Sequence, residues 1–92
     1  MSATIWKYPI SITDRQEIMM PGQPEVLSVG LDPGLVACVW ARVRPGEPDI
    51  KVHLRLYGTG NPCDVPPEWP FIGTFVMGAL VWHVFASRGA AR

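Results

Sequence analysis

Two alternating segments decide the fold, LVACVWARVR (residues 35–44) and IKVHLRLY (residues 50–57), joined by PGEP (residues 45–48). Apolar and other side chains alternate in both, which is typical of strands with one buried face. A short connection containing Pro and Gly between two such strands predicts a β-hairpin. Burying both apolar sets on one face sets its register. The expected pairs are Val43 with Ile50, Ala41 with Val52, Val39 with Leu54, and Ala37 with Leu56.

The opposite face of this hairpin would gather basic side chains around one aromatic ring. The whole chain has eight Lys and Arg against eight Asp and Glu, so such a cluster would be local and not a sign of general basicity. An aromatic plane beside guanidinium groups suits a phosphorylated ring compound. The simpler alternative is an ordinary solvated sheet face. The predicted ligand-binding residues are Trp40, Arg42, Lys51, His53 and Arg55, with Lys7, Tyr57, Trp69 and His83 as additional candidates.

Composition extends the β interpretation to the whole chain. Ten prolines and nine glycines in 92 residues mark frequent turns, and no window of ten residues has a helical apolar period. Further strands are expected at residues 4–10, 16–20 and 26–31, and a second hairpin at 71–76 and 79–85. We therefore predict an all-β fold, a small antiparallel β-sandwich or barrel of about seven strands. It would form a single domain over residues 1–92, with residues 87–92 as a frayed tail.

Several classes of function are disfavoured. The balanced charge argues against a general nucleic-acid binder, and the apolar run at 71–86 is too interrupted to span a membrane. The first residues lack the basic start of a secretory signal, so Cys38 and Cys63 are expected as reduced thiols. No metal-ligand spacing and no nucleophile motif is present. We expect no metal, no cofactor, no catalytic residues and no enzymatic activity.

The segment GTGNPCDVPPEWP (residues 58–70) is the one long irregular region expected. Its opening resembles half of a phosphate-binding glycine loop, but the Lys-Ser/Thr ending is missing, so an ordinary turn is favoured. Four prolines stiffen the segment, and Trp69 within it is the tryptophan expected at the surface or an interface. Trp6 and Trp82 are expected in the core. Because four tryptophans and four methionines are many for one small core, a homo-oligomer is also expected.

Four further motifs are TIWKYP (residues 4–9), ITDRQ (12–16), YGTG (57–60) and HVF (83–85). Together they resemble the pattern of a family of small uncharacterised bacteriophage and prophage proteins. The resemblance implies a phage origin and action in the host bacterial cytoplasm. Small phage accessory proteins often oppose host immunity, and many ligand-sequestering examples are β-rich homo-oligomers with basic pockets.

The expected function is therefore counter-defence without catalysis. The protein would bind and sequester a phosphate-bearing small molecule, such as a cyclic nucleotide immune signal. One alternative is an inhibitor that blocks a host defence protein, such as a CRISPR or other immune effector, by direct contact through Trp69 and its loop. Another is a virion or morphogenesis component.

Overall fold

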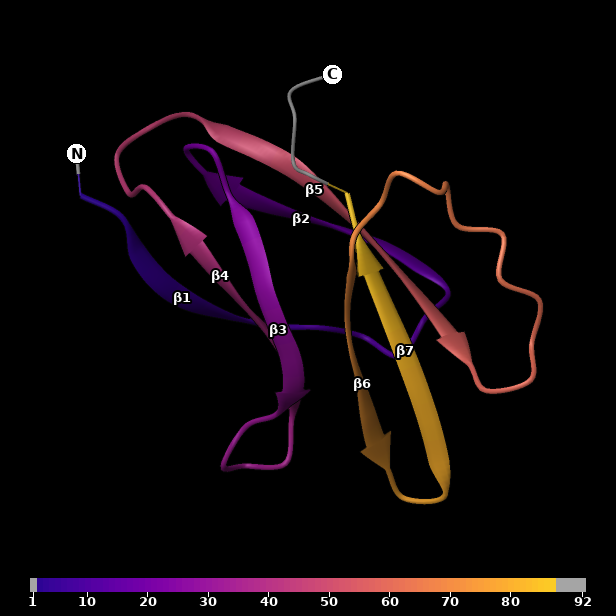
Figure 1. Ribbon diagram of the computed structural model, residues 1–92. Coiled ribbons are helices and arrows are strands. Elements are labelled where there is room, and N and C mark those ends of the chain that lie inside the picture. Colours follow the sequence, from indigo (N-terminus) through magenta and orange to yellow (C-terminus); the bar gives the residue numbers. More distant parts are fainter. Residues whose placement is uncertain (1, 88–92) are drawn as a thin grey trace.

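The computed structural model describes residues 2–87 and shows seven strands and no helix within that range (Figure 1). Residues 88–92, most of the expected frayed tail, lie outside the described residues. None of the described residues forms a helix of the length and apolar character needed to cross a membrane. The strands are β1 (Thr4–Pro9), β2 (Arg15–Pro21), β3 (Glu25–Leu31), β4 (Ala37–Val43), β5 (Asp49–Gly58), β6 (Phe71–Met77) and β7 (Leu80–Ala86).

The strands form two antiparallel sheets that pack face to face. The first has three strands in the order β1-β4-β3, and the second has four in the order β2-β5-β7-β6. Beyond the pairs within each sheet, β3 of the first sheet and β6 of the second come close together and join the two layers. The prediction of an all-β antiparallel fold of seven strands is confirmed, and the sandwich is the form adopted.

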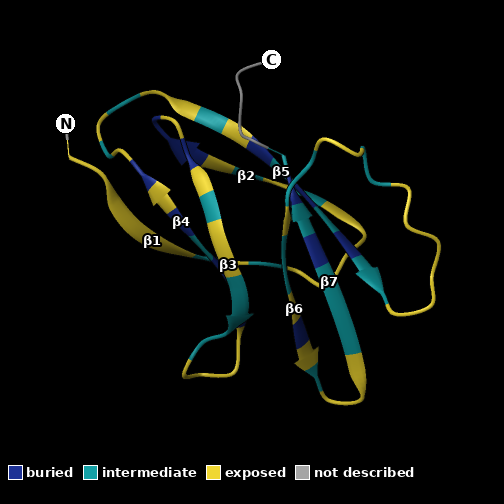
Figure 2. Cartoon of the chain, viewed as in Figure 1, coloured by how far each residue is buried: buried dark blue, intermediate teal, exposed yellow. Residues whose placement is uncertain are grey.

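The core lies between the two sheets and draws mainly on β4 and β5 (Figure 2). Alternate residues of both strands are buried, with Val39 and Leu54 each fully inaccessible to solvent. Tyr8 and Trp82 are partly buried and pack against this core. Trp82 was expected there, whereas Trp6 is 42% exposed and does not fill the core as predicted.

The hairpin predicted from β4 and β5 is wrong. β4 pairs with β1 and β3, and β5 pairs with β2 and β7, so the two strands lie in different sheets. Residues 44–48 carry the chain from one layer to the other. The two apolar sets do face one another, but across the sandwich and not side by side in one sheet. The expected pairs Val43–Ile50, Ala41–Val52, Val39–Leu54 and Ala37–Leu56 are replaced by Thr4–Val43, Trp6–Ala41, Tyr8–Val39 and Leu31–Ala37 in one sheet, and by Met20–Ile50, Ile18–Val52, Gln16–Leu54 and Leu56–Val84 in the other.

The second predicted hairpin is confirmed. β6 and β7 pair antiparallel from Phe71–Phe85 to Met77–Leu80. Gly78 occupies the turn with a φ of 62°, a left-handed conformation that glycine adopts without steric cost. A β-bulge near Phe71 interrupts the pairing at the far end of β6.

Ser87 departs from the expectation of a frayed end. Its N–H donates to the carbonyl of His53 at 2.8 Å, and its hydroxyl accepts the N–H of His53 at 3.0 Å. These two hydrogen bonds fix the residue after β7 to the middle of β5. The end of β7 and the His53 region of β5 are therefore held as one unit.

Candidate functional site

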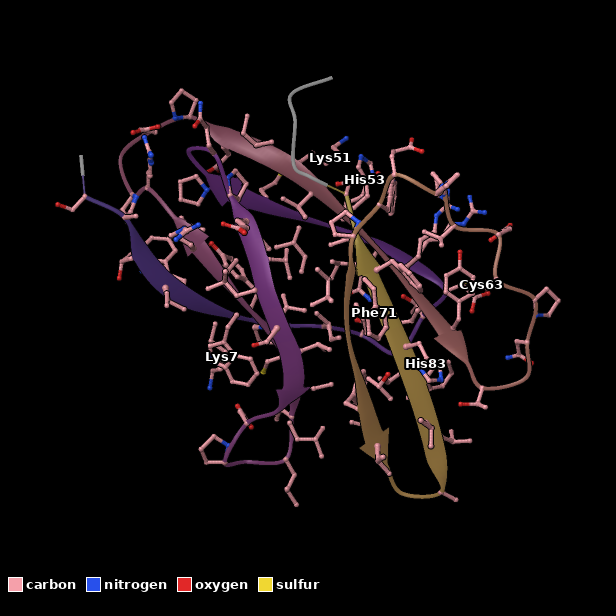
Figure 3. All side chains as sticks on the ribbon, viewed as in Figure 1. Lys7, Lys51, His53, Cys63, Phe71 and His83 are labelled. Carbon is pink, nitrogen blue, oxygen red and sulfur yellow. The ribbon has the colours of Figure 1, made fainter. Side chains whose placement is uncertain are left out.

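The predicted ligand-binding residues do not form one surface. Trp40 and Arg42 lie on the outer face of the three-stranded sheet, whereas Lys51, His53 and Arg55 lie on the outer face of the four-stranded sheet. Figure 3 shows the separation through Lys7, which projects from the layer of β1, and Lys51 and His53, which project from the other layer. The single basic face is therefore a wrong prediction, and its cause is the wrong hairpin.

Polar side chains on the three-stranded sheet are paired with one another. Arg42 forms an ion pair with Glu25 of β3. Lys7 donates a hydrogen bond of 2.8 Å to Asp32, and this contact raises the pKa of Lys7 and lowers that of Asp32. Trp40 lies over Gly30 on the neighbouring strand. Arg42 and Lys7 on the outer face of this sheet are thus both engaged by carboxylates of the same sheet.

The four-stranded sheet carries a groove of about 630 Å³ at the β2–β5 pair. Arg15 of β2 lies directly opposite Arg55 of β5, and Glu17 lies opposite His53. Residues opposed in an antiparallel pair project to the same face, so all four side chains share the outer surface. We call this the Trp69 groove, and it is lined by Arg15, Gln16, Glu17, His53, Leu54, Arg55 and Trp69.

The aromatic wall of the Trp69 groove comes from the proline-rich connection between β5 and β6. The guanidinium carbon of Arg55 lies 4.9 Å from the centre of the Trp69 ring, within the range of a cation–π contact. The His53 ring centre lies 6.2 Å from the same tryptophan. The Arg55 side chain is only 18% exposed as a result. Trp69, and not Trp40, supplies the aromatic plane beside the basic side chains.

Asp64 holds this connection to the strands beneath it. The Tyr57 hydroxyl donates to its Oδ1 at 2.8 Å, and its carboxylate oxygens lie 3.7 Å from Arg15 and 3.8 Å from Arg55. Tyr57's hydrogen bond lowers the pKa of Asp64, while burial raises the pKa of Tyr57. The two arginines therefore share one carboxylate, and neither contact is at close hydrogen-bond distance.

A second carboxylate, that of Glu17, moderates the charge on the same face. It lies 3.6 Å from the Lys51 ammonium and 3.5 Å from the His53 ring nitrogen. Three permanent cations, Arg15, Lys51 and Arg55, thus face two carboxylates, Glu17 and Asp64. The surface is positive in balance, but less so than the predicted face, which gathered four bases, Arg42, Lys51, His53 and Arg55.

A smaller cavity of about 280 Å³ lies beside β7, below the start of the same connection. Phe85 forms its aromatic floor, with Tyr57 and Phe71 in edge-on contact at 5.9 and 5.3 Å. His83 bonds Thr59 at 2.7 Å through Nε2 and Thr74 at 2.8 Å through Nδ1. His83 therefore fixes the Gly58–Asn61 turn to the sheet, and both of its ring nitrogens are already occupied.

Reasoning from the sequence missed two charged members of the Trp69 groove, Arg15 and Glu17, and its anchor, Asp64. The alternation of Arg15, Glu17 and Met19 along β2 shows that they share a face, and this signal was available. Nothing in the sequence indicates that β2 lies beside β5, or that Asp64 reaches back to both arginines.

Other site chemistry is limited in residues 2–87. No group of three or more His, Cys, Asp or Glu side chains there could hold a metal ion. Both cysteines are free, as predicted: Cys38 is buried, which raises the pKa of its thiol, and Cys63 is exposed at the smaller cavity.

Comparison with known proteins gives the chain a family but no activity. A family model described as a domain of unknown function, DUF7352, matches residues 1–92, and the chain belongs to this family. No curated protein and no solved structure matches it.

Proposed function

We propose that this DUF7352 protein is a non-enzymatic binding protein that sequesters a phosphate-bearing small molecule in the Trp69 groove. One observation carries the proposal: two guanidinium groups, Arg15 and Arg55, are directly opposed beside the plane of Trp69. Like charges opposite one another on adjacent strands are destabilising unless an anion lies between them. A phosphate is the natural anion for two arginines, because guanidinium groups bind its oxygens through charge-assisted hydrogen bonds.

Asp64 takes the place of that anion in the free protein. Its carboxylate contacts both arginines only at 3.7 and 3.8 Å and is 71% exposed, so an incoming phosphate can displace it. The Trp69 ring and the His53 ring beside it would receive a planar base. A nucleotide, including a cyclic nucleotide, combines these two features.

The biological setting follows from the resemblance to small phage proteins. Sequestration of a nucleotide signal in the bacterial cytoplasm would protect an infecting phage from a host immune response. The competing proposal is a blocking inhibitor that uses Trp69 and its connection to contact a host protein. Such an inhibitor would bind no nucleotide, so one nucleotide-binding experiment separates the sequestration proposal from the inhibitor proposal.

The test is isothermal calorimetry with inorganic phosphate, AMP, cyclic di- and trinucleotides and cyclised NAD derivatives. Each charge-assisted contact contributes roughly 1.5–3 kcal/mol, so Arg15→Ala is expected to weaken binding about ten- to a hundredfold. Arg42→Ala is the matched control, because Arg42 is a similarly exposed, ion-paired arginine on the opposite layer. Its affinity should equal that of the wild type.

Asp64→Asn should change the affinity in the opposite direction. Removing the competing carboxylate should tighten phosphate and nucleotide binding, because the two arginines lose their internal partner. Failure of all these compounds to bind would reject the ligand proposal. If Arg42→Ala weakened the binding of a compound and Arg15→Ala did not, the site would lie on the three-stranded sheet instead.

A further inference from the structure

The first strand leaves one edge of the three-stranded sheet without a partner. Within residues 2–87, β1 pairs with β4 alone, and Figure 1 shows it along the margin of its layer. All its residues except Tyr8 are exposed. Unpaired backbone donors and acceptors on such an edge are a template for pairing with another strand.

The hydrogen-bonding direction of β1 shows which backbone groups are free. The N–H of Ile10, the residue after β1, donates to the carbonyl of Ala37 at 2.9 Å. In an antiparallel pair, alternate residues direct their N–H and C=O groups toward the partner. Trp6 lies four residues before Ile10, so its backbone N–H and C=O also point toward β4. The backbone groups of Ile5 and Lys7 therefore point toward the open edge. Pro9 shares their direction and has no N–H to offer, so it ends the available stretch.

The other three edge strands carry features that hinder such pairing. β3 has a bulge at Leu27, β6 has one near Ile72, and β2 carries Arg15 and Glu17 and ends at Pro21. In β1 the only charged side chain is Lys7, and its ammonium is bound to Asp32. The usual protection of an edge by a free lysine is thus absent here.

Trp6 adds an apolar reason for this edge to be covered. It lies opposite Ala41, a core residue, and so belongs to the inner side of its sheet. Even so it is 42% exposed, because β1 lies at the open side of the sandwich. Ile5 on the outer side is 58% exposed.

We propose that β1 pairs antiparallel with β1 of a second copy of this chain, with Trp6 opposite Trp6 at the two-fold axis. This register places Ile5 opposite Lys7 of the second copy, so both residues exchange their free backbone hydrogen bonds. A register centred on Lys7 would oppose two ammonium groups and is disfavoured. The formal net charge of zero leaves no overall charge repulsion between copies, and the product is a continuous six-stranded sheet.

Sedimentation equilibrium tests the proposal on the full chain, from about 1 μM to about 1 mM. A short edge contact forms a small interface, so association should depend on concentration and approach twice the 10.2 kDa chain mass. Ile5→Pro removes a donor that faces the open edge and leaves the β1–β4 bonds intact. It should weaken association roughly tenfold or more, whereas Ile5→Thr, which keeps the donor, should not. Circular dichroism and thermal melting verify that both variants fold.

A disulfide tests the register. Opposed residues in a non-hydrogen-bonded antiparallel pair have Cα atoms about 4.5 Å apart, which a disulfide can bridge. In a Cys63→Ser background, Trp6→Cys should oxidise to a covalent dimer, and Thr4→Cys should not. Wild type that stays monomeric throughout, or a dimer that Ile5→Pro leaves unchanged, would overturn the proposal.

Discussion

Asp32 shows how a single side chain sets the path of a turn. The order Asp32-Pro33-Gly34 suggests a turn with glycine in the left-handed position, yet the residue with a positive φ, 64°, is Leu35. The Asp32 carboxylate accepts the N–H groups of Gly34 at 2.9 Å and Val36 at 3.0 Å. It thereby extends the turn by one residue and leaves the Leu35 side chain 72% exposed. These two local hydrogen bonds outweigh the general preference for glycine in the left-handed conformation.

Gly22, at the end of β2, is held by backbone geometry and by a close neighbour. Its φ is 81°, and a Cβ there would lie 2.6 Å from the Cβ of Arg44. Gly60 has a similar φ of 91°, but no atom lies within 4 Å of the position that a Cβ would occupy. Gly60→Ala should lower the free energy of unfolding by about 1–2 kcal/mol from backbone strain alone. Gly22→Ala should lower it by about a further 1–3 kcal/mol, because the chain must shift away from Arg44. Urea denaturation of both variants measures the difference, and equal losses would contradict the steric argument.

Alternation assigns faces within an element only until a bulge interrupts it. Simple alternation along residues 26–31 predicts Leu27, Val29 and Leu31 on one inner face of β3, but the register shifts between Val26 and Ser28. Val26, Val29 and Leu31 pack against the core, and Leu27 is 40% exposed. The extra residue displaces the alternation by one position, which is the geometric effect of a bulge.

The β3–β4 turn and β1 are tied together by the Lys7–Asp32 ion pair, and this contact predicts a pH dependence. The hydrogen bond from Lys7 holds the pKa of Asp32 below its ordinary 3.8. The folded protein therefore binds this proton less readily than the unfolded chain does. The stabilisation is complete above pH 3.8 and is lost as the pH falls through the lowered pKa.

Asp32→Asn tests this linkage, because the asparagine oxygen can still accept the turn N–H groups. The wild type should be more stable than the variant at pH 7, and the gap should close as the pH falls toward 2. Urea denaturation across this range measures the gap, because urea is uncharged and does not screen the ion pair. A gap that persists at pH 2 would show that the turn hydrogen bonds, and not the ion pair, distinguish the two proteins.

At the scale of the whole molecule, β4 and β5 are internal strands of opposite sheets, and their buried side chains join the layers. Leu54 is fully buried in this contact, whereas Leu80 at the β6–β7 turn is 58% exposed. Leu54→Ala should lower the free energy of unfolding by about 2–5 kcal/mol, because it removes apolar contacts and leaves a cavity. Leu80→Ala should change it by about 0.5 kcal/mol or less. Comparable losses in thermal or urea unfolding would mean that the interlayer contact is not the main core.

The sequence by itself determined the fold class, the positions of the strands and the face on which most side chains lie. The alternation in residues 35–44 and 50–57 identified Val39, Ala41, Val52, Leu54 and Leu56 as core residues, and each is buried. It also placed Lys51, His53 and Arg55 together on one outer face. These results are local, because the two-residue period of a strand records which of its faces is buried.

Only the tertiary structure decided which strands are neighbours. A period of two is the same whether β5 lies beside β4 or across the core from it, because both arrangements bury the same apolar face. The neighbours of each strand depend on how all seven strands pair, and β1 and β3 pair with the two edges of β4. The Trp69 groove has the same origin. Its arginines come from two strands, and its tryptophan and carboxylate anchor come from the connection between β5 and β6. Only the packing of the chain brings them together.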